Sequence, residues 1–165
     1  MTQDTSCGHG PSVQIGQTAV SPEHYDARQQ HIESVGSAMP KRVFVSFDYD
    51  YDKTLKDFLI GQAKNPDSPF EIHDWSIKEA SPDWRQKARA RIRASDVVIV
   101  ICGEHTDEAV GVAIEVRIAQ EELIEYFLLN GYSGKNGKKP TTARATDKVY
   151  QWTWENLKLL VGGAR

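Results

Sequence analysis

Residues 96–102, with the sequence DVVIVIC, contain the feature that most constrains the fold. The five consecutive β-branched residues at 97–101 favour a strand. A strand that is apolar on both faces belongs inside a sheet that is covered on both sides, as parallel sheets are. We therefore expect residues 97–101 to form the central strand of a mostly parallel sheet with helices on both faces.

Segments with strand and helix patterns alternate on both sides of this strand. The expected elements are strands at 42–47, 69–75, 97–101 and 124–129, helices at 52–64, 83–95, 107–122 and 152–162, and a loop rich in Gly and Lys at 131–140. This alternation predicts an α/β fold, a doubly wound parallel sheet with right-handed crossovers.

The spacing of apolar residues predicts which helical side chains face the sheet. They are Leu55, Phe58 and Leu59 in the first helix and Trp84, Ala88 and Ile92 in the second. Asp52 precedes the first helix, and we expect its side chain to cap that helix. Trp75 and Trp84 flank a polar loop, where core packing and a lid over a planar ring are both compatible with the pattern.

Length and charge indicate one domain with an N-terminal tail. The chain has 165 residues, and residues 1–40 are polar and acidic, with room for one short helix at about 21–35. The tail has one basic and four acidic residues, so the domain at 41–165 has 19 of each and is neutral. A net charge of −3 argues against broad nucleic-acid binding, and no run of 18 apolar residues is present to span a membrane.

The N-terminus and the cysteines complete the expectations drawn from composition. The first residues lack the basic start and apolar stretch of a secretory signal, so we expect a cytoplasmic protein. Cys7 and Cys102 are far apart in different kinds of segment, which predicts neither a disulfide framework nor a zinc site. We expect both to be free thiols.

In a doubly wound sheet, ligands bind beyond the carboxyl ends of the strands near the point where strand order reverses. This rule directs attention to residues 46–52 and 102–115. In a helix, Glu115 has only small or apolar neighbours one turn away, namely Gly111, Val112, Ile118 and Ala119. A carboxylate with such neighbours either lines a cleft or lies at a helix edge and pairs with a residue distant in sequence.

The stretch SFDYDYD at 46–52 places acidic side chains directly after the first strand. Asp48 and Asp50 have three possible roles: binding a metal, binding the hydroxyls of a ribose, or forming a solvated turn. The basic residues of the helix at 83–95 form stripes, for which a solvated face is the default interpretation, with diphosphate binding or an oligomer contact as alternatives.

Three segments, KRVFVSFDYD, the DW at 74–75 and DVVIVICGEHTDEAVGVAIEV, together resemble the TIR-like family related to the small TIR proteins of bacterial Thoeris anti-phage defence. The resemblance covers residues 41 to about 130 and extends more loosely over 131–165. It implies a flavodoxin-like fold and an enzyme that cleaves the bond between nicotinamide and ribose in NAD. NAD is then the substrate and not a cofactor, and the reaction requires no metal. The product is often a cyclic or modified ADP-ribose signal.

The resemblance also implies roles for individual residues. Glu115 matches the catalytic glutamate, and the substrate-binding positions are Ser46, Phe47, Asp48, Tyr49, Trp75, Gly103, Thr106 and Gly111. Many TIR enzymes have a Trp four residues before the glutamate, where this chain has Gly111.

Three classes of function follow. The first is NAD cleavage in a homo-oligomer whose product is read by a downstream effector. The second is a non-catalytic TIR-like interaction module, which Gly111 favours. The third is a receiver-like regulator, because Asp48 and Asp50 resemble an acidic magnesium-binding pair, although the third strand runs into Cys102 and no aspartate stands there to accept a phosphoryl group.

Overall fold

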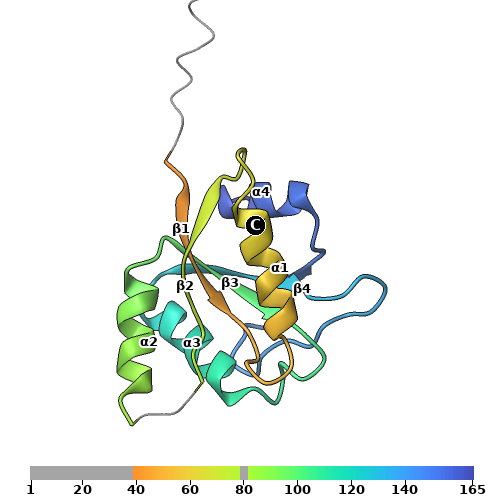
Figure 1. Ribbon diagram of the computed structural model, residues 1–165. Helices are drawn as coiled ribbons and strands as arrows, with labels where there is room; N and C mark the ends of the chain where they lie inside the picture. The colour runs from red at the N-terminus through yellow and green to blue at the C-terminus, as the bar shows by residue number, and fades with distance from the viewer. Residues whose placement is uncertain (1–38, 79–81) are drawn as a thin grey trace, which may run out of the picture. The chain divides into compact units, whose positions relative to one another are not determined.

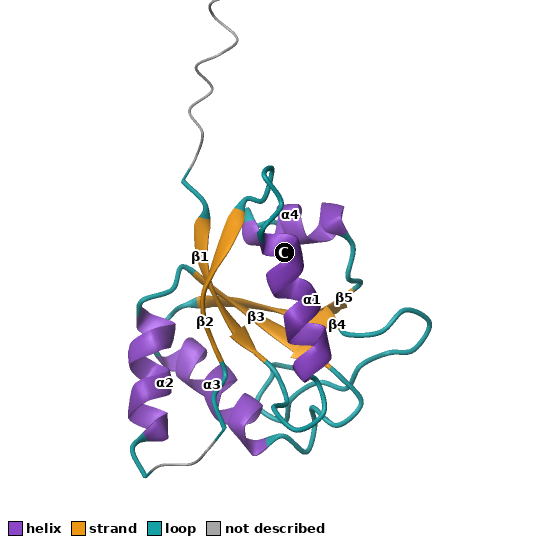
Figure 2. Cartoon of the chain, viewed as in Figure 1, coloured by secondary structure: helices purple, strands orange, loops and turns teal. Residues whose placement is uncertain are grey.

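The computed structural model describes residues 39–78 and 82–165. Figures 1 and 2 show a sheet between two pairs of helices. Almost all of the expected tail, residues 1–38, lies outside the described residues, so its helix and the domain boundary stay predictions. None of the described helices is long and apolar enough to cross a membrane.

The sheet has five strands in the order β2-β1-β3-β4-β5, and every neighbouring pair is parallel. The strands are β1 (Lys41–Ser46), β2 (Phe70–Trp75), β3 (Val97–Cys102), β4 (Glu125–Asn130) and β5 (Val149–Tyr150). This arrangement confirms the predicted flavodoxin-like, doubly wound α/β fold, with β3 in the centre and β1 and β4 beside it. All six residues of β3 are buried, as expected for a strand covered on both faces.

Four helices cover the two faces of the sheet, α1 and α4 on one face and α2 and α3 on the other (Figure 2). Their bounds are α1 (Lys53–Ala63), α2 (Trp84–Arg93), α3 (Val110–Glu121) and α4 (Trp154–Val161). Alternate strand residues supply two separate cores. Val45 and Ile99 pack in one core with Leu59 of α1, whereas Phe44 and Val98 pack in the other with Ile92 of α2.

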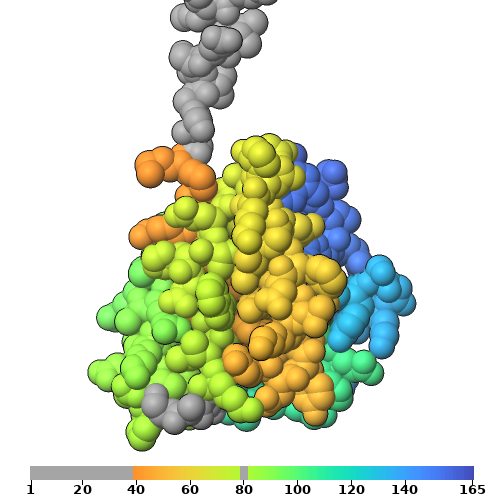
Figure 3. Space-filling model, in the orientation of Figure 1, coloured from red at the N-terminus to blue at the C-terminus, as the bar shows by residue number. Residues whose placement is uncertain are grey.

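The predicted packing of the first two helices is confirmed in part. Trp84, Ala88 and Ile92 are all buried against the sheet. Phe58 is 64% exposed, so its predicted core position is wrong. The buried side of α1 centres on Leu59, and Phe58 lies about 100° around the helix from it. The outer side of α1 therefore forms part of the surface seen in Figure 3.

Three further local features differ from the sequence prediction. Asp52 occupies the position before α1, but its side chain makes no capping hydrogen bond. The helix expected at 107–122 begins only at Val110, because residues 103–109 form a turn. β5 was not predicted; its two residues pair with Leu128 and Leu129 of β4 and are too few to give a strand pattern in the sequence.

Candidate active site

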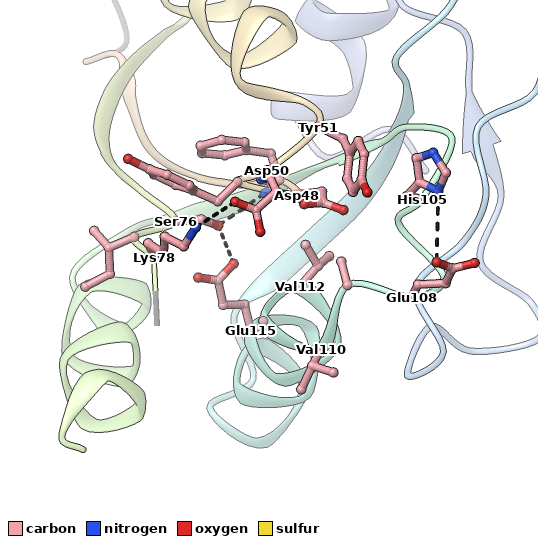
Figure 4. Close-up of a pocket in the computed structure, with 15 residues that line it drawn as sticks. Asp48, Asp50, Tyr51, Ser76, Lys78, His105, Glu108, Val110, Val112 and Glu115 are labelled. Carbon is pink, nitrogen blue, oxygen red and sulfur yellow. Dashed lines mark hydrogen bonds and ion pairs between the residues drawn. The ribbon is translucent and has the colours of Figure 1, made fainter. Parts of the chain in front are cut away.

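A cavity of about 380 Å³ opens at the carboxyl ends of β1, β2 and β3 (Figure 4). The chain passes from β1 to β2 on one side and then returns to β3 on the other side of β1. The cavity thus lies at the switch point where ligands bind in open α/β sheets. Its walls come from residues 47–51 after β1, from 76–78 after β2, and from His105, 108–112 and Glu115 after β3. Its volume is within the ~300–1,000 Å³ range of small-molecule sites.

Glu115 of α3 lines this cavity although its residue is only 2% exposed. Its Oε2 accepts a hydrogen bond of 2.6 Å from the Ser46 hydroxyl and one of 2.5 Å from the Ser76 hydroxyl. Ser46 is the last residue of β1, and Ser76 follows the last residue of β2. Neighbouring parallel strands therefore each direct one hydroxyl at the same carboxylate oxygen.

The backbone fixes the second of these hydroxyls. The Phe47 N–H donates to Ser76 Oγ over 3.1 Å, which leaves the hydroxyl proton for Glu115. Hydrogen bonds to a carboxylate are charge-assisted and stronger than those between neutral groups. Two of them compensate part of the cost of burying this acidic side chain and hold it in one orientation.

The turn after β1 places Asp48 at the cavity wall. Asp48 is 9% exposed, and its Oδ1 accepts from the Asp50 N–H over 3.0 Å. The Asp52 N–H donates to the Asp48 carbonyl over 2.8 Å, so the turn is closed by both the backbone and the side chain of Asp48. The Tyr49 ring stacks with Phe47 at 6.1 Å between centroids. Within 39–78 and 82–165, no group of three or more His, Cys, Asp or Glu is arranged to hold a metal ion.

Gly103 and Thr106 shape the turn between β3 and α3. The Gly103 N–H donates to Thr106 Oγ1 over 2.7 Å, and Thr106 is fully buried. A Cβ on residue 103 would lie 2.1 Å from Asp52 Oδ2, so only glycine fits at this approach. These residues build the loop that carries α3, and neither lines the cavity.

Asp52 is a buried carboxylate beneath this turn. It is 0% exposed, and neither carboxylate oxygen has a hydrogen-bond partner among the described residues. Burial, followed by the charge of Asp48, raises the pKa of Asp52 to about 6, while His105 and Thr106 act in the opposite direction. Burial, with the nearby Asp52 charge, likewise raises the pKa of the Cys102 thiol to about 12, which keeps it protonated and unreactive at neutral pH.

The rim of the cavity has exposed aromatic and charged side chains. The Tyr51 and His105 rings lie 4.3 Å apart and join the loops after β1 and β3. Lys78 Nζ lies 2.9 Å from Asp50 Oδ1, and both side chains are more than 60% exposed. The first turn of α3 also borders the cavity, and the N-terminal end of a helix has partial positive charge.

The structure brings most of the predicted site residues together. Phe47, Asp48, Tyr49, Gly111 and Glu115 line the cavity, and Ser46 contacts Glu115 from below. Trp75 does not line it; the residue is 40% exposed, with Lys56 Nζ 5.4 Å from its ring centroid.

Sequence reasoning did not single out several side chains at this cavity, among them Ser76, Lys78 and His105. The position of Ser76 was a usable signal, because this small polar residue follows directly after a predicted strand that ends beside the first one. Lys78 and His105 lie in loops whose course no periodic pattern in the sequence indicates.

The strand order and the cavity at its switch point define a flavodoxin-like α/β domain. A family model described as Thoeris protein ThsB, TIR-like domain, matches residues 44–130, more than half of the 165 residues. The chain belongs to this family, which supports a TIR-like role in anti-phage defence. No curated protein matches the chain.

Proposed function

We propose that this protein cleaves the N-glycosidic bond between nicotinamide and ribose in NAD, with Glu115 as the catalytic carboxylate. The observation that carries the proposal is the placement of Glu115, which is 2% exposed, hydrogen-bonded by two serines, and yet part of the wall of a cavity large enough for a small molecule. Burying a carboxylate at such a position costs stability, and sites kept at that cost are commonly functional.

The reaction places its charge where such a carboxylate acts. The bond between ribose C1′ and the nicotinamide nitrogen breaks, and its electron pair stays with nitrogen, so neutral nicotinamide leaves. The positive charge of the ring passes to C1′ and the ring oxygen of the ribose. A fixed carboxylate beside the ribose stabilises that charge, as in glycoside hydrolysis. Capture of C1′ by water releases a proton and gives ADP-ribose, and capture by a nucleophile of the adenosine half gives a cyclic product.

The two serines hold Glu115 in the orientation that this role requires. Both hydroxyls donate hydrogen bonds to Glu115 Oε2. A carboxylate that is already oriented needs no rearrangement while positive charge develops on the ribose. Asp48, at the same cavity, is available to accept hydrogen bonds from ribose hydroxyls. In this proposal Ser46 and Ser76 orient Glu115, and Asp48 binds the ribose.

A non-catalytic TIR-like interaction module is the second candidate. The observation that favours it is Gly111, which lines the cavity where many TIR enzymes have a Trp, so one aromatic wall is missing. Under this alternative the chain assembles with other TIR-like domains, and the buried Glu115 serves to join α3 to the ends of β1 and β2.

Nicotinamide release decides between these candidates. Purified full-length protein is incubated with NAD, with and without extract of infected cells, and nicotinamide is measured by chromatography. Release that Glu115→Gln removes and Glu121→Gln retains supports the enzyme, because Glu121 is on the same helix but pairs with Arg89 at the surface. No release under any of these conditions supports the interaction module.

The proposal includes the biological setting. The protein acts in the cytoplasm as a homo-oligomer, and its nucleotide product is read by a downstream effector. Light scattering under conditions of activity tests the assembly, and a strictly monomeric active protein contradicts it.

A further inference from the structure

The charge of the cavity is unbalanced for a dinucleotide substrate. Its lining includes the carboxylates Asp48, Asp50, Glu108 and Glu115. Among the lining residues in the described part of the chain, Lys78 is the one lysine or arginine. NAD has a diphosphate with two negative charges, which such a lining repels unless a cation meets it.

Lys78 is placed to be that cation. It follows β2 by three residues and lines the same cavity as Ser76 and Glu115, with its amine directed toward Asp50 (Figure 4). Its Nζ also lies 5.9 Å from the centroid of the Tyr49 ring. Glu115 is buried, whereas Lys78 lies at the rim of the cavity. From the interior to the opening, the two groups therefore follow the same order as the nicotinamide ribose and the diphosphate along NAD.

The existing partner of Lys78 is easily exchanged. Its ion pair with Asp50 is between side chains that are 64% and 63% exposed, and pairs of this kind contribute little because water screens them. A lysine has a flexible stem and a compact charge, so its amine can move from one anion to another with little rearrangement. A diphosphate has more charge than a single carboxylate and competes well for it.

We propose that Lys78 binds the diphosphate of the dinucleotide, and that it leaves Asp50 when substrate enters. The proposal rests on the proposed function for the identity of the substrate. The first turn of α3 borders the same cavity, so its partial positive charge adds to that of Lys78. The diphosphate then lies at the rim while the nicotinamide ribose reaches Glu115.

The test is Lys78→Met, with Lys53→Met as the matched control. Lys53 is exposed, and its Nζ lies 6.0 Å from the Tyr49 centroid, almost the distance of Lys78, but it does not line the cavity. We expect Lys78→Met to raise KM for NAD about 10-fold, the lower end for a charged hydrogen bond, with kcat changed less than about twofold. Lys53→Met is expected to leave both unchanged.

Two phosphate comparisons make the assignment specific. Nicotinamide riboside has the same scissile bond and no phosphate, so its kcat/KM is expected to be equal in wild type and Lys78→Met. Lys78→Arg, which keeps the charge, is expected to restore most of the affinity for NAD. Equal losses for NAD and nicotinamide riboside, or a KM for NAD that does not change, would overturn the assignment.

Binding of ADP-ribose separates this inference from the proposed reaction, because it requires no turnover. Calorimetry is expected to show about 10-fold weaker binding of ADP-ribose to Lys78→Met than to wild type. If this holds and no nicotinamide is released, the reaction fails and the diphosphate site stands. If wild type and Lys78→Met bind ADP-ribose equally, or wild type does not bind it, the diphosphate site is wrong.

Discussion

Glu115→Gln tests the central residue, since it removes a charge while nearly keeping the size of the side chain. The amide oxygen of Gln can still accept the hydroxyls of Ser46 and Ser76, which now lie 2.6 and 2.5 Å from Oε2. We expect nicotinamide release to fall by at least about 100-fold, the effect of removing one group that stabilises charge in a transition state. The readout is nicotinamide formed by equal amounts of folded wild type and variant.

The same substitution is expected to leave the free energy of unfolding nearly unchanged. Each hydroxyl loses about 1 kcal/mol when its acceptor becomes neutral, so the two together lose about 2 kcal/mol. Relief of the cost of burying a charge is of similar or larger size, several kcal/mol per ion. The melting temperature is therefore expected to equal that of wild type or to rise by a few degrees, at roughly 4 °C per kcal/mol.

Glu121→Gln provides the comparison, because it makes the same chemical change on the same helix at a residue whose side chain is 48% exposed. We expect it to keep activity and to lose at most about 1 kcal/mol of stability with its exposed ion pair to Arg89. Full activity in Glu115→Gln refutes the catalytic assignment. A large loss of stability with retained activity makes Glu115 a structural residue instead.

Three further predictions test the loop after β3, the buried Asp52 and the packing of α1. Gly103→Ala is expected to lower the free energy of unfolding in urea by about 1–3 kcal/mol, because the new Cβ would lie 2.1 Å from Asp52. Gly61→Ala in α1 is expected to raise it by about 0.5–1 kcal/mol, because the space at its Cβ is open. Equal effects of the two substitutions contradict the packing argument. The pKa of Asp52 is raised from 3.8 to about 6, so the folded state binds the proton more tightly than the unfolded state, and stability falls as pH rises through about 4–6. Asp52→Asn lacks this loss, so it is expected to be more stable than wild type by roughly 2 kcal/mol at pH 7.5 and equally stable near pH 4. Thermal melts across this pH range test the prediction. Parallel stability profiles of the two proteins refute the assignment. Leu59→Ala is expected to lower the free energy of unfolding in urea by about 2–5 kcal/mol, and Phe58→Ala by about 0.5 kcal/mol or less, because these residues are 0% and 64% exposed. The reverse order of the two losses would mean that α1 packs by its other face.

The sequence predicts the frame of the fold well because burial on two faces leaves a strong pattern. The pattern of residues 97–101 predicts a strand that is buried on both faces, and the structure places them in the centre of the sheet. Trp84, Ala88 and Ile92 repeat at helical spacing and are all buried. The prediction for Phe58 is wrong because its spacing fits the apolar stripe of α1, and nothing in the sequence shows that the buried stripe ends beside it.

The candidate site is predictable to the extent that its parts follow strand ends. Glu115 stands out in the sequence through the absence of charged neighbours at helical spacing, and the structure shows it nearly buried at the cavity. Its partner Ser76 is 39 residues away, so their contact depends on the whole crossover between β2 and α3. Asp52 looked like a helix cap, and its burial against Gly103 required the fold of a second loop.

The register of the sheet and the geometry of the site have the same cause. Along β1, Val43 and Val45 face α1 and α4, whereas Phe44 faces α2 and α3. Side chains alternate along a strand, so Ser46 continues the side of Phe44 and comes to lie beneath α3. There it meets Glu115. A slip of one residue would put Phe44 in the core of α1 and α4, put Val43 and Val45 in the core of α2 and α3, and direct Ser46 at α1 instead. The burial that fixes β1 therefore also fixes the hydroxyl that orients the carboxylate, and the site needs no separate device to align it.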